Sequence, residues 1–350
     1  MSPAKWQLPP EWASQSCVLL TWPHRNSDWS TWLTQVEAVY CELATQISRF
    51  EALIIICRDP HHILHVKKQL AASGAVTARI NYHAIPTNDT WIRDYGPISL
   101  MGHRQARLLD CTFNGWGGKF AAELDNRLSR RLHQRGVFPQ WSLKTIDFIL
   151  EGGSIDNDGN GTLMSTSTCL LNPNRNPRYN RQEIEKMLRT QLGVKRVFWL
   201  EQGHIIGDDT DGHIDMLARF CDTQTIAYAS CDNPDDAHFT SLQAMERELR
   251  RLRTLANKAY HLVPLPLPTP LFDPMGQRLP ASYANFLIIN RAVLVPLYDD
   301  PATDTLVMKR LSACFPGREI IGIPCRTLIL EHGSLHCATM HIPAIPAYRD

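Results

Sequence analysis

The pattern of apolar and polar residues predicts short strands that alternate with helices. Residues 52–57 form a continuous apolar run, which is typical of a buried strand, and residues 18–22 predict a short strand that ends before a proline. Apolar side chains between these strands recur near helical spacing, so we expect a helix over residues 28–50, capped by Asp28. An Asp-Pro pair opens a further predicted helix over residues 59–72, because proline is favoured in a first helical turn.

The same alternation continues along the chain and indicates an α/β fold. The remaining helices are expected over residues 121–135, 181–192, 236–258 and 304–315. The remaining strands are expected over residues 146–150, 161–171, 282–290, 292–297 and 319–323, with a hairpin formed by 282–290 and 292–297. No fixed-period repeat is evident. No G-x-G-x-x-G pattern follows the first strand, which disfavours a nucleotide-binding Rossmann domain.

An acidic stretch at residues 207–215 is the first candidate for a functional site. Four carboxylates and one imidazole occur within these nine residues. If residues 213–220 form a strand, alternate side chains share a face, so His213 and Asp215 would point the same way. One alternative is a solvated acidic turn. Another is a metal site, since histidine and aspartate both ligate metals.

Three further segments combine polar, aromatic and glycine residues as ligand-binding loops do. Residues 86–97 carry Trp91 and Asp94 between prolines, although Asp94 could simply make a turn contact with its neighbouring arginine. Residues 113–119 are rich in glycine and aromatic residues but lack the spacing of a phosphate-binding P-loop. Glu151 ends a predicted strand and precedes two glycines, which allow another group to approach the backbone closely.

The cysteines indicate a reducing compartment and one exceptional thiol. None of the ten forms a C-x-x-C pair, which disfavours a thiolate zinc site, and several lie in apolar runs as reduced core residues do. Cys337 differs because it follows a Gly-Ser turn and a histidine. Such a polar setting, with a nearby cation, suits a reactive thiolate, whereas the alternative is an inert buried cysteine.

Composition narrows the class of protein. The 350 residues are 44% hydrophobic and 20% charged, as in ordinary soluble proteins, and the net charge of +1 predicts no nucleic-acid partner. No apolar run is long enough to span a bilayer, and residues 1–10 lack the features of a signal peptide. We therefore expect a cytoplasmic protein with no membrane partner.

Seven motifs occur in one order and carry a resemblance to a known family. They are Asn-Asp-x-Trp-x-Arg-Asp-x-Gly-Pro at 88–97, Phe-Asn-x-Trp-Gly-Gly at 113–118, Glu-Gly-Gly at 151–153, Asn-x-x-Arg-Asn-Pro at 172–177, Asp-Gly-His-Ile-Asp at 211–215, Ser-Tyr-x-Asn-Phe at 282–286 and His-Cys at 336–337. Together they resemble the agmatine deiminase family, which includes the Porphyromonas-type peptidyl-arginine deiminases. The resemblance covers nearly the whole chain. It departs from the family pattern at Met216, at residues 332–335 and at Met340-His341.

The resemblance implies a fold and a set of roles. The fold is the pentein fold, a five-bladed α/β propeller of pseudo-repeats around a central site, formed by residues 1–350 as one catalytic domain. The implied roles are nucleophile for Cys337, general acid/base for His213, guanidinium-binding carboxylates for Asp94 and Asp215, a further site carboxylate for Glu151, and a pocket-lining role for Trp91. Apart from the resemblance, Asp208, Asp209 or Asp211 of the acidic run could attract a substrate amine at the mouth of the pocket, and we take Asp209 as the candidate substrate contact. The implied partner is a small guanidine, with no cofactor and no metal, and a homodimer is a candidate assembly.

The implied chemistry agrees with the residue types. A guanidinium ion is resonance-stabilised, so its carbon is a poor electrophile, and two carboxylates can hold its N–H groups for attack by a thiolate. We expect hydrolytic deimination of agmatine to N-carbamoylputrescine and ammonia, a step of putrescine and polyamine synthesis, through an amidino-thioether on Cys337. One alternative is the same chemistry on free or peptidyl arginine or another guanidine. The other is a non-catalytic protein that binds cationic ligands.

Overall fold

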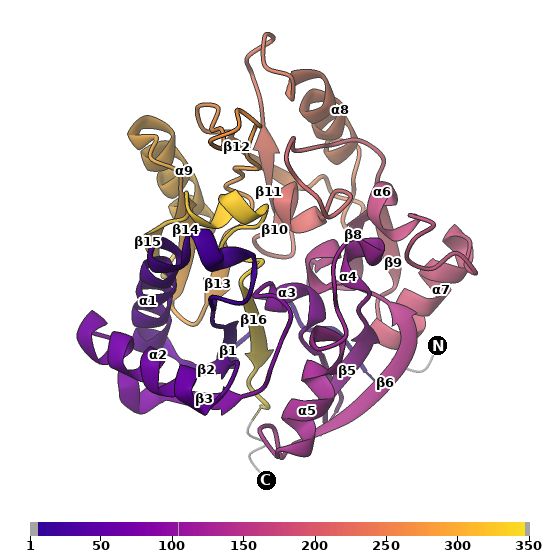
Figure 1. The fold of residues 1–350 in the computed structure, drawn as a ribbon. Helices are drawn as coiled ribbons and strands as arrows, with labels where there is room; N and C mark the ends of the chain where they lie inside the picture. Colours follow the sequence, from indigo (N-terminus) through magenta and orange to yellow (C-terminus); the bar gives the residue numbers. More distant parts are fainter. Residues whose placement is uncertain (1–5, 104, 347–350) are drawn as a thin grey trace.

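Five small sheets surround the centre of the molecule (Figure 1). The computed structural model describes residues 6–103 and 105–346, and all counts here refer to these residues. One sheet has four strands and the other four sheets have three strands each. The five-bladed α/β arrangement that the resemblance implies is therefore confirmed.

Each three-stranded blade follows one plan. Two consecutive strands pair antiparallel, and a third strand then pairs parallel with the second. A parallel neighbour cannot be reached through a tight turn, so a helix lies in the crossover before the third strand. The repeat is one of architecture, which explains why no fixed period is visible in the residues themselves.

Four blades contain the following elements in chain order. The second blade contains β4 (Ile98–Met101), β5 (Ala106–Thr112), α5 (Leu128–Gln134) and β6 (Trp141–Ile149). The third contains β7 (Asp156–Asn157), β8 (Thr162–Thr166), α7 (Arg181–Leu192) and β9 (Arg196–Leu200). The fourth contains β10 (Ala218–Phe220), β11 (Thr225–Ser230), α8 (Phe239–Leu249) and β12 (His261–Pro266). The fifth contains β13 (Leu287–Ile289), β14 (Ala292–Leu297), α9 (Pro301–Cys314) and β15 (Glu319–Pro324).

The first blade joins the two ends of the described chain. It contains β1 (Gln15–Thr21), α1 (Leu33–Phe50), β2 (Ala52–Cys57), α2 (Pro60–Ser73), β3 (Ile80–Ala84) and β16 (Thr339–Pro343). Strand β16 pairs antiparallel with β1, with Met340 opposite Leu19. This pairing closes the ring of blades and brings Cys337, two residues before β16, to the centre.

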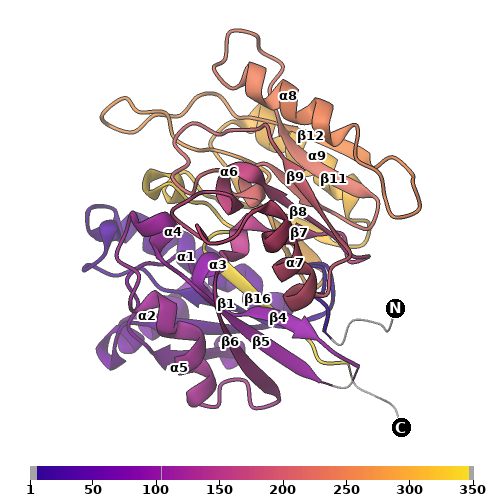
Figure 2. The same ribbon diagram turned by 90° about the vertical axis from the view of Figure 1, so that its right-hand side faces the viewer.

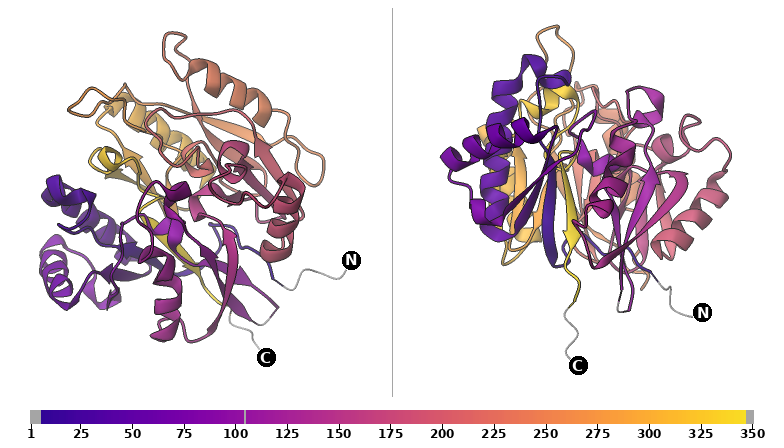
Figure 3. Two further views of the ribbon diagram at one scale, coloured as in Figure 1. Left: turned by 45° about the vertical axis from the view of Figure 1, so that its right-hand side comes forward. Right: turned by 60° about the horizontal axis from the view of Figure 1, so that its bottom comes forward.

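The helices lie on the outer sides of the blades. Figure 2 shows α8 on the outside of the fourth blade, and both views of Figure 3 keep the long crossover helices at the periphery. Helix α1 shows the reason, since its buried residues Val36, Tyr40, Leu43 and Ile47 recur at helical spacing and pack inward. The loops at the centre are therefore free to carry polar side chains.

Several predicted elements are confirmed at nearly their expected bounds. Strand β2, helix α7 and the β13–β14 hairpin lie where the apolar pattern placed them, although β13 is shorter than expected. Helix α2 begins after Asp59, whose side chain accepts a hydrogen bond from the backbone N–H of His62. Helix α7 begins with a capping box between Asn180 and Glu183, which satisfies otherwise unpaired backbone N–H groups.

Other predicted elements were wrong in length or type. The helix expected over 236–258 ends at Leu249, because the chain then turns so that the backbone N–H of Thr254 bonds the carbonyl of Lys258. The strand expected over 161–171 ends at Thr166, whose side chain caps the short helix α6 (Ser167–Leu170). The helix expected over 121–135 starts only at Leu128, after a 3-10 turn.

The loops that were expected to bind ligands contain single helical turns. These are α3 (Ile92–Tyr95), α4 (Gly115–Gly118) and a 3-10 turn at Ile214–Met216. The strand expected over 213–220 is therefore wrong, since only Ala218–Phe220 is extended as β10. Among the described residues, no helix has the length and apolar content needed to cross a membrane.

Candidate active site

A cavity of about 540 Å³ opens at the centre of the ring of blades. Its walls come from links between blades and from crossover segments inside the first two blades, which explains why residues far apart in sequence meet there. The lining residues are Asp28, Asp89, Trp91, Asp94, Trp116, Phe120, Asp208, Asp209, Thr210, His213, Met216, Glu331, His332, Gly333 and Cys337. Of the expected site residues, Trp91, Asp94, Asp209, His213 and Cys337 line this cavity, and Asp215 and Glu151 lie behind it.

Asp94 lies in α3 and is held by two donors. One carboxylate oxygen accepts the backbone N–H of Gly153 at 2.9 Å, and the other accepts the Trp116 indole N–H at 3.0 Å. The alternative that Asp94 makes only a local turn contact is thus wrong. Burial raises the pKa of Asp94 to about 6, and the neighbouring carboxylates Asp215 and Glu151 act in the same direction, against His213.

Gly153 allows three charged groups to lie close together. This agrees with the prediction that the glycines after Glu151 allow other groups to approach the backbone closely. A Cβ atom at this position would lie 2.7 Å from Asp94 Oδ1, 2.7 Å from His213 Nδ1 and 3.1 Å from Asp215 Oδ2. Such distances are far below van der Waals contact, so only glycine fits without displacing these groups. The two glycines after Glu151 therefore define the spacing of the site.

His213 lies just before the 3-10 turn at Ile214–Met216 and is completely buried. Its Nε2 lies 3.2 Å from Glu151 Oε2, and its Nδ1 lies 3.5 Å from Asp94 Oδ1 without a hydrogen-bond partner among the described residues. Burial opposes the imidazolium form, but Asp94 and Glu151 outweigh it and raise the pKa of His213 well above its ordinary value. The 3-10 turn brings His213 and Asp215 into the same site. The prediction that both would lie on one face of a strand was therefore wrong in its structural reason.

Glu151 is fixed behind His213 by an arginine. Arg175 Nε lies 2.8 Å from Glu151 Oε2, and Arg175 Nη1 lies 2.7 Å from Asp211 Oδ2. Burial raises the pKa of Glu151, but the hydrogen bond with His213 and the charge of Arg175 lower it below its ordinary value overall. Asp211 is consequently turned away from the cavity and is not a candidate for substrate contact.

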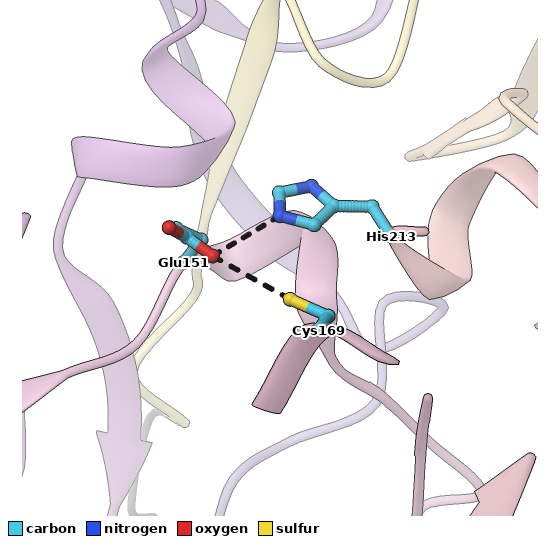
Figure 4. A group of neighbouring side chains, drawn as sticks. All are labelled: Glu151, Cys169 and His213. Atoms are coloured by element: carbon cyan, nitrogen blue, oxygen red, sulfur yellow. Dashed lines mark hydrogen bonds and ion pairs between the residues drawn. The ribbon is translucent and has the colours of Figure 1, made fainter. Parts of the chain in front are cut away.

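Cys169 completes a buried group with Glu151 and His213 (Figure 4). Its Sγ lies 3.7 Å from Glu151 Oε2, and one donor atom from each of the three residues lies within 4.8 Å of the others. The donor types suit zinc. Arg175 already contacts both oxygens of Glu151, however, so a metal ion would face a buried guanidinium, and the geometry favours an ion pair. Sequence reasoning did not single out Cys169, which follows four serine and threonine residues at 165–168.

Cys337 is buried, with 5% of its surface exposed, and its contacts are polar, as expected, although they are an amide and a carboxylate and not a cation. Its Sγ lies 3.3 Å from Asn285 Nδ2 and 3.6 Å from Asp215 Oδ2. Burial raises the pKa of the Cys337 thiol well above its ordinary value, and the charges of Asp215 and Asp94 raise it further. The free protein therefore holds Cys337 as a thiol.

Asp215 lies beneath Cys337 and is also completely buried. His336 Nδ1 lies 2.8 Å from Asp215 Oδ2, while Asp215 Oδ1 has no hydrogen-bond partner among the described residues. Burial raises the pKa of Asp215, but the hydrogen bond from His336 outweighs it and lowers that pKa. We call Asp94, His213, Asp215 and Cys337 the floor of the site.

A second group of carboxylates lies at the outer part of the cavity. We call Asp28, Asp89, Asp209 and Glu331 the mouth. Burial, with repulsion from Asp28, raises the pKa of Asp89 and of Glu331 to about 7 each. Asp28 was expected to cap a helix, but it lies in a 3-10 turn, and α1 begins only at Leu33 with Trp32 at its cap position. Asp89 and Glu331 had no predicted role.

Aromatic side chains separate the floor from the mouth. Trp91, Trp116 and Phe120 line the cavity, and Trp91 packs against Gly333, where a Cβ atom would lie 2.6 Å from its ring. Asp208 also lines the cavity, but its oxygens accept hydrogen bonds from Thr210 and from the backbone N–H of Gly212. Asp208 therefore shapes the loop that presents Asp209 and His213.

The five-bladed fold and the buried cysteine, histidine and carboxylates define a pentein hydrolase that acts on C–N bonds of amidines. The family model described as Porphyromonas-type peptidyl-arginine deiminase matches residues 7–343, and the chain belongs to this family.

Relatives of the chain carry two descriptions. The chain is 33% identical to an agmatine deiminase of Stutzerimonas stutzeri over 96% of this chain and 95% of the relative. It is 38% identical to a solved agmatine deiminase of C. jejuni with substrate bound, at a TM-score of 0.91 with 100% and 99% of the two chains covered. It is 47% identical to a Porphyromonas gingivalis structure described provisionally as an arginine deiminase, at a TM-score of 0.90 with 97% and 98% covered.

Proposed function

We propose that this protein hydrolyses agmatine to N-carbamoylputrescine and ammonia, a reaction that serves putrescine and polyamine synthesis. The observation that supports this function most directly is the placement of carboxylates at both ends of one cavity. The floor offers Asp94 and Asp215 beside the Cys337 thiol, and the mouth offers four more acidic side chains. Agmatine carries a guanidinium at one end and an ammonium at the other, so each end meets negative charge. The agmatine deiminases among its relatives support the same substrate.

The floor suits a guanidinium ion. Asp215 Oδ1 has no hydrogen-bond partner among the described residues, and the carboxylates of Asp94 and Asp215 both lie against Gly153. Guanidinium N–H groups can bond both carboxylates, which fixes the central carbon beside Cys337 Sγ. Glu151 acts behind them by orienting His213.

The mouth suits an ammonium group better than an amino acid. No lysine or arginine is present among the residues that line the cavity, so an α-carboxylate would face carboxylates without a cationic partner. The methylene chain of agmatine would pack against Trp91, Trp116 and Phe120. Free arginine and a peptidyl arginine would each place a carboxylate or a neutral peptide group where Asp209 and Glu331 favour a cation.

The reaction balances without a metal or a redox partner. When the guanidinium binds, the Cys337 thiol releases its proton to solvent. The resulting thiolate attacks the guanidinium carbon, and protonated His213 donates a proton to the departing nitrogen, which leaves as ammonia. A covalent amidino-thioether remains. Water then attacks the same carbon, His213 accepts its proton, and the carbon–sulfur bond breaks to give the ureido product and the free cysteine.

Substrate binding supplies the charge that activates the nucleophile. In the free protein, burial and two carboxylates keep the pKa of Cys337 high. A bound guanidinium would neutralise these carboxylates and place a cation beside Sγ, both of which favour the thiolate. We therefore assign this role to the substrate itself, and we assign to His213 the role of proton donor.

The test is kcat/KM for agmatine, arginine and a blocked arginine peptide at one pH and one salt concentration, with ammonia release as the signal. We expect agmatine to be preferred by tenfold or more. Equal or higher values for arginine or the peptide would contradict the agmatine assignment and leave the thiol chemistry intact. No turnover of any guanidine, combined with tight binding of agmatine, would instead support a non-catalytic binding protein.

Three broader properties complete the proposal. A single catalytic domain over residues 1–350 is supported by the closure of the ring through β1 and β16, and by site residues spread from position 91 to position 337. A cytoplasmic location is supported by the ten cysteines, all within the described residues and all free thiols. We retain the homodimer as an assembly to be measured by light scattering.

A further inference from the structure

A second cavity lies behind the floor of the site. It is lined by the two residues that directly precede the floor residues Asp94 and Cys337 in the sequence. Arg93 precedes Asp94 and His336 precedes Cys337, and both line a rear cavity together with Glu11 and His341. The rear side therefore touches the floor directly. None of these four residues lines the front cavity that receives the proposed substrate.

His336 links the floor to the rear cavity through both of its ring nitrogens. Its Nδ1 lies 2.8 Å from Asp215 Oδ2, and its Nε2 lies 2.7 Å from Glu11 Oε2. Both contacts are hydrogen bonds only if both nitrogens carry a proton, since a carboxylate donates none. The geometry thus places an imidazolium directly behind Asp215.

Glu11 is itself fixed, so the linkage is rigid. Its Oε2 accepts a hydrogen bond from Arg219 Nη2 at 2.8 Å, and its Oε1 accepts the backbone N–H of Ile288 at 2.8 Å. Glu11, His336 and Arg219 are all buried. Buried, charge-assisted hydrogen bonds are strong and directional, so this chain restricts how Asp215 can rotate.

We propose that His336 is a positioning residue that keeps Asp215 ionised and directs its unpartnered oxygen toward the guanidinium. Asp215 Oδ2 is held by His336 and is also the oxygen 3.6 Å from Cys337 Sγ. The other oxygen, Oδ1, is left for substrate. This inference rests on the proposed guanidine chemistry, in which Asp215 binds the substrate cation.

The charges around this pair favour the same arrangement. The groups facing Asp215 are His336 and Cys337 before β16, His213 before the 3-10 turn, Arg219 on β10 and Asp94 on α3. The groups facing His336 on the rear side are Glu11, Asp156, Arg93 and His341. A cation at His336 adds to those of Arg219 and His213 in offsetting the repulsion between Asp94 and Asp215, which are two carboxylates in one buried site.

Two amide substitutions separate positioning from simple packing. Asparagine can place its N–H near the position of Nδ1, and glutamine can place its N–H near Nε2. His336→Asn therefore preserves a donor to Asp215, whereas His336→Gln preserves the contact with Glu11. His341→Asn is the matched control, because His341 lines the same rear cavity but contacts Arg93 at 3.1 Å, lies 3.8 Å from Glu11 Oε2 without a hydrogen bond, and has no contact with Asp215.

Two quantities are measured. The first is the pH profile of kcat/KM for each variant with Cys337 intact. The second is the Kd of agmatine for the same variants in a Cys337→Ala background, where no chemistry occurs. We expect His336→Gln to lower kcat/KM about a hundredfold and His336→Asn about tenfold. In both variants the acidic limb of the kcat/KM profile, and that of agmatine binding, should move to higher pH. The reason is that Asp215 loses the cationic imidazole ring that favours its ionised form. His341→Asn should change kcat/KM less than threefold and leave the limb in place.

Two results would overturn the proposal. One is full activity in both His336 variants, and the other is an equal loss in both with no movement of the acidic limb and no change in Kd. If the His336 variants do not fold, Glu11→Gln provides the test. It should lower kcat/KM about threefold to tenfold and move the acidic limb to higher pH. A Glu11→Gln variant that shows neither change overturns the proposal. If agmatine proves not to bind, the guanidinium ion replaces it as the probe, so failure of the substrate assignment stays distinct.

Discussion

The floor and the mouth of the cavity are both acidic, but they differ in the donors and cations that face their carboxylates. Each floor carboxylate has an assigned donor, with Gly153 and Trp116 on Asp94 and His336 on Asp215. The mouth carboxylates repel one another, and burial raises the pKa of Asp89 and of Glu331 to about 7. The floor is thus organised before substrate arrives, whereas the mouth gains most of its stabilisation from the arriving cation.

This difference separates two kinds of specificity. A preorganised floor recognises the geometry of a guanidinium and aligns it for attack, which affects the rate of chemistry. A crowded acidic mouth recognises charge, which affects affinity and selects among guanidines. Substitutions in the floor should therefore act mainly on kcat, and substitutions in the mouth mainly on KM.

The largest expected effect is loss of the nucleophile. Cys337→Ala should abolish ammonia release from every guanidine, since no other cysteine lines the front cavity. The side chain is small and buried, so the cost in the free energy of unfolding should be about 1 kcal/mol. Activity and thermal unfolding measured on the same preparation test both parts, with Cys41→Ala as a control on the outer helix α1. Substantial residual activity would show that the nucleophile has been assigned to the wrong residue.

Gly153→Ala tests whether the floor depends on close approach. The new Cβ would lie 2.7 Å from both Asp94 Oδ1 and His213 Nδ1, so these groups must move. We expect kcat to fall about a hundredfold, the scale associated with a displacement near 1 Å, with a smaller change in KM. Gly136→Ala is the control, since its Cβ meets no atom within 4 Å, although its φ of +67° costs stability. Near-normal kcat for Gly153→Ala would mean that the floor is more pliant than its hydrogen bonds suggest.

The sequence predicted the floor better than the mouth, for a physical reason. Floor residues lie within motifs of contiguous residues, so Asp94, His213 and Cys337 could be identified by resemblance. Asp28, Asp89 and Glu331 gather only because three separate loops meet, and the sequence indicated a helix cap for Asp28 and no role for the other two. Glu11 was likewise missed, because it acts across the ring from the N-terminal segment.

The secondary-structure predictions show a similar difference between elements that pack on the core and turns that carry the site. Elements packed on an apolar core, such as β2 and α7, followed from their periodicity. The turn at Ile214–Met216 did not, since an apolar run of that length fits a strand equally well and only its contacts decide. Cys337 was expected in a polar setting, and its neighbours are indeed polar, but closure of the ring by β16 buries it.

Glu331→Gln should weaken agmatine binding without slowing chemistry. One charge pair about 6 Å apart in an effective dielectric of about 20 is worth roughly 3 kcal/mol before screening, and partial exposure reduces this to about 1 kcal/mol. The KM for agmatine should therefore rise about fivefold, with kcat nearly unchanged. Methylguanidine, which has no second cation, should show no such rise. Asp235→Asn, on the surface of the fourth blade, is the control, and an equal effect on both substrates would remove Glu331 from amine recognition.

The smallest expected effect is a pH dependence that separates the two regions. Because the pKa values of Asp89 and Glu331 are raised to about 7, both side chains gain protons as the pH falls from 8 to 6. Two consequences have opposite signs. The contribution of these two side chains to the free energy of unfolding should increase over this range, since in the folded state they bind protons that they do not yet bind in the unfolded state. Binding of agmatine should weaken by a few fold, because the mouth loses negative charge, whereas binding of methylguanidine to the floor should change less.

The measurement is the Kd of both ligands in the Cys337→Ala variant, alongside thermal unfolding, at pH 6, 7 and 8. Parallel curves for the two ligands would show that the floor and the mouth titrate as one unit.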